Sequence, residues 1–247
     1  MPPRMPYEAR YGGSPHTVAH DHYAPALVAQ GRFEEALAEV RRGKELEPLS
    51  LVVHHHVAWI SLLARRNDDA IAECRSALEM DPAFAMAHRW MGIGLEQKGL
   101  YEQAIASLDQ AVKFDGGTSI SVAAAAHAYA MSGRTEEARR RLVQLKQAAA
   151  GRYVEPYALA LIAVALGDDE QALQWLEKAY RDNSIWLALW AKADPRLDVL
   201  RHNGRFQDLL CHLGLNGEPL PPFRVLRHQS ARLAEDRTTS SPIAEIT

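Results

Sequence analysis

The chain has 247 residues, of which 47% are hydrophobic and 24% are charged. That balance supports a folded core of ordinary size and excludes a chain that is disordered throughout. With 28 basic and 31 acidic side chains the formal net charge is -3, so no strong positive field attracts a polyanion, and nucleic acid is not expected as a direct partner.

Cysteine content and apolar runs bear on the compartment. Cys74 and Cys211 are the only cysteines, so the chain can build neither a disulfide framework nor a four-cysteine zinc site. The longest uncharged apolar run, residues 157–166, is about half the length needed to cross a bilayer. The N-terminal segment has no apolar signal region. We therefore expect a cytoplasmic chain without membrane insertion.

The first segment, residues 1–16, is short and rich in proline and glycine, so we expect it to be disordered. It includes His16, and His20, Asp21 and His22 follow closely. This spacing could place two metal ligands on one helix face, but no second ligand cluster has a matching spacing. We predict no metal site.

From residue 17 onward the sequence repeats at an interval of 34 residues. Small side chains recur at this interval: Ala36, Ala70, Ala104, Ala138 and Ala172. Twelve residues before each of them lies another small residue: Ala24, Ala58, Gly92, Ala126 and Ala160. Two columns of small residues let two helix backbones approach closely, so the pattern predicts a series of helical hairpins.

Turn residues fall where such hairpins need them. Gly31, Gly99, Gly133 and Gly167 each precede a polar or acidic stretch that suits the start of a helix. Pro48 and Pro82 close the first two complete units, because proline cannot extend the helix before it. Each unit is therefore expected to hold two helices.

The third unit resembles the tetratricopeptide-repeat family, whose unit combines W-x2-L-G-x2-Y, A-x3-F and a closing proline. The residues that carry the resemblance are His88, Met91, Gly92, Leu95, Ala104 and Leu108, with Gly116 in place of the proline. The resemblance implies an all-α fold, a right-handed solenoid of about five hairpins that span residues 17–183. Their expected bounds are 17–50, 51–84, 85–118, 119–152 and 153–183.

Residues 184–215 are expected to form a helical cap on the last hairpin, whose apolar face needs a cover. Their segment DPRLDVLRHNGRFQDLLCHLGL resembles a closing element found in the C-terminal repeat regions of bacterial multidomain transcriptional and signalling regulators. The matching residues are Asp194, Pro195, Arg196, Asp198, Leu200, Arg201, Arg205, Phe206, Gln207, Leu209 and Leu210. We expect the tail, residues 216–247, to be disordered.

The resemblance also implies a binding surface, because the first helices of the family line a concave groove. Carried over by position, the groove residues are His55, Trp59, Leu62, Met86, Arg89, Ile93, Glu96, His127, Tyr157 and Leu161. This lining is largely apolar with isolated polar anchors and suits an apolar peptide or an amphipathic helix. The alternative is that these side chains pack against neighbouring hairpins or against the chain's own tail.

A carboxylate clamp for chaperone C-termini, the family's best-known specific site, is not expected here. Its Lys, Asn, Asn, Lys and Arg positions hold Asp21, Pro25, His56, Met86 and Trp90. A partner of that class is therefore not predicted.

No catalytic or cofactor-binding constellation is recognisable, since the sequence has no phosphate loop, nucleophile elbow or zinc-protease motif. We predict a non-enzymatic adaptor without a cofactor, whose groove binds a protein or peptide. The alternative is a detached regulatory or sensor module of a bacterial transcription or signalling regulator.

Overall fold

The computed structural model describes residues 23–215, and every structural statement below refers to them. The expected disorder of residues 1–16 and 216–247, and the histidines before residue 23, lie outside this range. Residues 23–29 are helical. The elements that follow are α3 (Phe33–Leu46), α4 (Leu51–Leu63), α5 (Asn67–Met80), α6 (Ala85–Gln97), α7 (Tyr101–Asp115), α8 (Ser119–Met131), α9 (Thr135–Ala148), α10 (Pro156–Ala165), α11 (Asp169–Arg181), α12 (Ile185–Trp190), the 3-10 helix η1 (Pro195–Leu200) and α13 (Gly204–His212).

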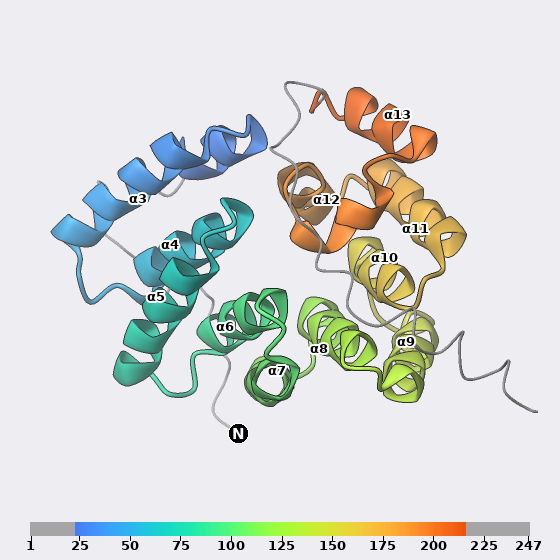
Figure 1. Cartoon of the computed structure of the whole chain (residues 1–247), viewed down its shortest axis with the longest axis horizontal. Coiled ribbons are helices and arrows are strands. Elements are labelled where there is room, and N and C mark those ends of the chain that lie inside the picture. Colours follow the sequence, from blue (N-terminus) through green and yellow to red (C-terminus); the bar gives the residue numbers. More distant parts are fainter. Residues whose placement is uncertain (1–22, 216–247) are drawn as a thin grey trace, which may run out of the picture.

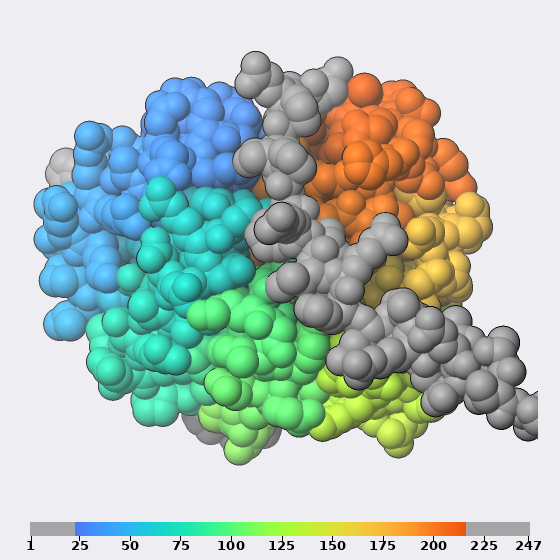
Figure 2. Space-filling view, in the orientation of Figure 1, coloured from blue at the N-terminus to red at the C-terminus, as the bar shows by residue number. Residues whose placement is uncertain are grey.

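Consecutive helices pack as antiparallel hairpins, which confirms the predicted all-helical solenoid. Figure 1 shows the hairpins following a curved path, with α4, α6, α8 and α10 on its inner side and α5, α7, α9 and α11 on its outer side. The inner helices also contact one another, α4 with α6, α6 with α8 and α8 with α10. Figure 2 shows the first hairpins on the left of the molecule and the last helices on the upper right. None of the helices in residues 23–215 is long and apolar enough to cross a membrane.

The small-residue columns lie at the helix crossings. Ala36, Ala70, Ala104, Ala138 and Ala172 are all 0% exposed. At the central crossing, a Cβ built on Gly92 would lie 2.4 Å from Cγ of Leu108 and 3.0 Å from the carbonyl oxygen of Ala104. Only glycine fits at this position, so the small residues at the crossings allow the backbones of the two helices to approach closely.

The turns inside the hairpins require a left-handed residue. Gly31, Gly99, Gly133 and Gly167 have φ between 75° and 87°. Arg65 occupies the corresponding place in the second hairpin, with φ 63°. A residue with a side chain is strained at positive φ. This turn therefore differs from its four equivalents, because contacts with other parts of the chain must stabilise it.

The C-terminal elements cover the fifth hairpin. The helix η1 contacts α10, and α12 and α13 contact α11. Three residues separate α11 from α12, the same number that separate α7 from α8. The helix α12 therefore stands where the first helix of a sixth hairpin would begin, on the inner side of the curve (Figure 1).

Replacing Gly92 with Ala should lower the free energy of unfolding by about 1 to 3 kcal/mol, because overpacking at the crossing outweighs the gain in helix propensity. The measurement is urea unfolding followed by circular dichroism. Gly204→Ala is the matched control, since a Cβ there meets nothing within 4 Å and Gly204 begins α13. If both variants unfold like the parent, the crossing does not depend on close approach.

Candidate functional site

The predicted groove residues lie on the inner helices, but most are buried in the folded chain. His55 and Met86 are half-buried. The buried members are Trp59, Leu62, Arg89, Ile93, Glu96, His127, Tyr157 and Leu161. A partner can reach the first two directly and the others only after whatever covers them has moved. Their role in binding stays a prediction.

Four tryptophans from three helices meet at the centre of the concave face, and we call them the tryptophan clasp: Trp59 of α4, Trp90 of α6, and Trp186 and Trp190 of α12. The Trp190 ring is stacked on Trp59 at 5.6 Å between centroids and on Trp90 at 4.9 Å. Trp186 lies 6.5 Å from Trp90. The clasp thus joins the second and third hairpins to α12.

His55 holds the indole of Trp90 in place. The Trp90 Nε1–H donates to Nδ1 of His55 at 2.6 Å, and the two rings are nearly parallel. Nδ1 can accept this hydrogen bond only when it carries no proton. Burial, with the nearby positive charge of Arg89 and the neighbouring His56, lowers the pKa of His55 well below its usual 6.5. The imidazole is therefore neutral at physiological pH.

The guanidinium of Arg89 lies beside the clasp. Its central carbon is 4.7 Å from the Trp90 ring centroid and 5.6 Å from that of Trp186, within cation–π range. It also donates to the hydroxyl of Ser121 at 3.2 Å and lies 3.8 Å from Asp115. The charge of this predicted binding residue is thus shared between the rings and the next hairpin.

Tyr157 anchors the cap rather than lining an open groove. Its hydroxyl donates to Oδ2 of Asp194 at 2.6 Å, and Arg196 donates to both carboxylate oxygens at 2.9 and 2.6 Å. Desolvation opposes ionisation of Asp194, but the charge and hydrogen bonds of Arg196 outweigh it and lower the pKa of that carboxyl. Burial and the Asp194 charge raise the pKa of Tyr157 far above its usual value.

Two further predicted groove residues form a buried pair between α6 and α8. Nδ1 of His127 lies 2.8 Å from Oε1 of Glu96, and both side chains are buried. The second carboxylate oxygen of Glu96 has no hydrogen-bond partner among the described residues. Leu62 instead packs beside Ile71, since a Cβ on Gly94 would meet both side chains. In the folded chain these side chains pack between hairpins.

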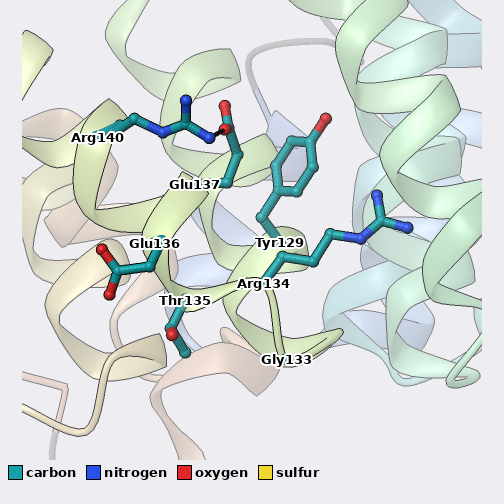
Figure 3. Close-up of a pocket in the computed structure, with 7 residues that line it drawn as sticks. All are labelled: Tyr129, Gly133, Arg134, Thr135, Glu136, Glu137 and Arg140. Carbon is teal, nitrogen blue, oxygen red and sulfur yellow. Dashed lines mark hydrogen bonds and ion pairs between the residues drawn. The ribbon is translucent and has the colours of Figure 1, made fainter.

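A shallow depression lies elsewhere, on the turn into α9. Figure 3 shows its lining: Tyr129, Gly133, Arg134, Thr135, Glu136, Glu137 and Arg140. Its charged side chains are paired, Arg140 with Glu137 and Arg134 with Glu102 of the preceding hairpin. These are solvated ion pairs of the outer surface. Among residues 23–215, no three His, Cys, Asp or Glu side chains group as metal ligands would.

Sequence reasoning missed Trp186 and Trp190, because residues 184–215 were interpreted only as a cover. A usable signal was present: both residues fall in a short apolar segment that begins after Ser184, whose hydroxyl caps α12 by accepting from Leu187 N–H. Such a cap marks the start of another first helix. First helices carry the concave face.

Comparison with known proteins agrees with this fold. The family model of the tetratricopeptide repeat matches residues 157–181, which hold most of α10 and all of α11. A tetratricopeptide-repeat protein of Thermus thermophilus is similar in structure, with a TM-score of 0.55 at 21% identity over 73% of this chain and 98% of that one. Another from Parabacteroides merdae has a TM-score of 0.55 at 14% identity, over 85% of this chain and 83% of that one. A search of the curated proteins finds no significant match.

The fold is therefore an all-helical solenoid similar to that of these two tetratricopeptide-repeat proteins. Fold similarity at such low identity does not specify the partner.

Because His55 must lose its proton to accept from Trp90, stability should fall as the pH drops. Below about pH 6.5 the unfolded chain binds a proton at this position that the folded chain does not, which lowers stability by up to about 1.4 kcal/mol per pH unit. In His55→Asn the amide oxygen can replace Nδ1 but cannot titrate, so its unfolding free energy should fall less between pH 7 and pH 5. Equal pH slopes for parent and variant would contradict the neutral imidazole.

Replacing Tyr157 with Phe removes a buried hydrogen-bond donor and leaves Asp194 short of one partner. We expect a loss of about 1 to 3 kcal/mol in the free energy of unfolding. Tyr180→Phe is the control, because Tyr180 is 40% exposed. Thermal and urea unfolding of the two variants should differ by that amount, whereas equal stabilities would mean that the bond to Asp194 contributes little.

Proposed function

We propose that this chain is a non-enzymatic adaptor that binds a protein segment along its concave face. The observation that carries the proposal is the composition of that face, where His55, His56, Met86 and Trp186 are half-buried on the same helices that carry the buried rings of the clasp. Aromatic and apolar side chains with few free charges are the usual anchors of peptide recognition. Helix or extended-peptide binding in a groove is the mode that fits an inner face built from helices.

The accessible part of the candidate site consists of its half-buried side chains and not of its buried ones. The buried positions deeper in the face, such as Trp59 and Tyr157, hold the fold together through Trp190 and Asp194. Binding that leaves the fold as it stands would therefore use the half-buried side chains. Met86 is the most informative of these, because a charge there disturbs an apolar contact surface.

The test begins with a random peptide library displayed on phage and selected against the full chain. Selected peptides should bind the parent and Val143→Glu equally, and bind Met86→Glu at least about tenfold more weakly. Val143 is the matched control because it is apolar, 51% exposed and on α9 of the outer layer. Peptides that lose affinity only for Val143→Glu would move the site to the outer layer. Failure to select any peptide would contradict the adaptor proposal.

A second candidate is a detached sensor module of a bacterial regulator that takes a small ligand in the same face. The resemblance of the segment from Asp194 to Leu210 favours it. A thermal-shift screen of common metabolites tests it. A ligand that stabilises the parent but not Met86→Glu would support this role, and a screen without any stabilising ligand would count against it.

A further inference from the structure

Two sides of the concave face, far apart in sequence, meet through the tryptophan clasp. We propose that the clasp opens, and that its ring sites then accept a partner segment with aromatic side chains four residues apart, in the places that Trp186 and Trp190 occupy. This inference rests on the proposed function, because it names the class of segment that the concave face binds.

The contact that α12 makes resembles that of a bound helix. Trp186 and Trp190 stand four residues apart and therefore project from one side of the helix. Trp190 lies between two rings of other hairpins, with interplanar angles of 25° to Trp59 and 16° to Trp90. Amphipathic helices bind in grooves in the same way, by placing two or more apolar or aromatic side chains of one helix face against the receptor surface. The chain supplies both receptor and ligand.

The clasp can open without unfolding a hairpin. In a solenoid each unit packs mainly on its neighbours, and the clasp joins α4 and α6 to α12, which are not neighbours along the array. The other side of α12 has its own support, since Leu187 is 0% exposed and α12 contacts α11. Separation across the groove therefore leaves α12 in place on the fifth hairpin and exposes the rings.

One ion pair joins the second hairpin to η1 and reinforces the closure. Nη2 of Arg65 lies 2.8 Å from Oδ1 of Asp198 in η1, although 133 residues separate them. Arg65 occupies the left-handed turn position at which the other described hairpins carry glycine. The backbone of Arg65 is strained, and its side chain pairs with the cap. We therefore infer that arginine at this position helps to hold the second hairpin against the cap.

A closed clasp competes with any partner for the same rings. The affinity measured for a partner is reduced by the fraction of molecules whose clasp is open. Variants that weaken the α12 side of the clasp should therefore bind a matching segment more tightly, whereas loss of the rings on α4 or α6 should weaken binding. Opposite effects from the two sides distinguish competition from simple damage to the fold.

The probe is a fluorescent peptide with the sequence of residues 183–196, added in trans to the full chain and followed by fluorescence anisotropy. The double variant Trp186→Ala/Trp190→Ala should bind it about tenfold more tightly than the parent does, because the peptide's rings replace the missing pair. Trp175→Ala is the control, since Trp175 lies on α11 beside Lys146 and outside the clasp. A peptide with both tryptophans changed to Ala should not bind.

Arg65→Gly provides a second, well-folded test, because it removes the ion pair to Asp198 and also relieves the strained turn. It should retain the parent's circular dichroism spectrum and bind the peptide about threefold more tightly. Equal and weak binding by the parent, the double variant and Arg65→Gly would overturn the inference. That result would leave the adaptor proposal standing if display-selected peptides still distinguish Met86→Glu from Val143→Glu.

Discussion

The close crossing of two backbones within each hairpin is the constraint on which the rest of this structure depends. Such crossings admit only Ala or Gly, and the repeat places one in each helix of every pair. The crossing of α6 and α7 shows how tight the fit is, because Gly92 meets both Leu108 and the backbone of Ala104. Repetition of this contact fixes which helices face inward, and so which side chains can form a common surface.

The inner surface that results is more closed than an open peptide groove. Rings of the second and third hairpins meet the rings of α12, and Tyr157 meets Asp194 at the base of the cap. Buried ionisable side chains lie in pairs, His127 beside Glu96 and Arg196 with Asp194. Breaking one partner of such a pair leaves an uncompensated charge, so these contacts set the geometry of the face as much as its stability.

Periodicity was sufficient to predict the fold, whereas the candidate site depended on contacts that no local pattern records. The two sets of small residues that repeat every 34 positions, one containing Ala36 and the other Ala24, indicate where helices cross. The turn glycines indicate where helices end. Position in the repeat also placed Trp59 and Arg89 on the inner face. What covers them depends on how far the array curves, because curvature brings α12 back toward α4. Curvature sums small rotations between hairpins, and a repeat pattern does not specify it.

The residues that stabilise the contact between the cap and the second and third hairpins could not be predicted from the sequence either, because their partners are distant along the chain. Arg65 is one charged residue among many in the sequence, and its significance comes from a partner 133 residues away. His55 belonged to a run of three histidines that a helix directs to different sides. Its role depends on one hydrogen bond from Trp90, which only the assembled face supplies.

The whole inner face depends on the position of Trp190 between Trp59 and Trp90 in the folded chain. Stacked indoles couple their electronic transitions and give an exciton couplet in circular dichroism, so the couplet reports the clasp directly. We expect a couplet in the parent that persists in Trp175→Ala and is strongly reduced in Trp190→Ala, where only the more distant Trp186–Trp90 pair remains, while the helical signal is unchanged. A parent spectrum without the couplet, or a couplet of unchanged amplitude in Trp190→Ala, would show that Trp190 does not lie between the two rings.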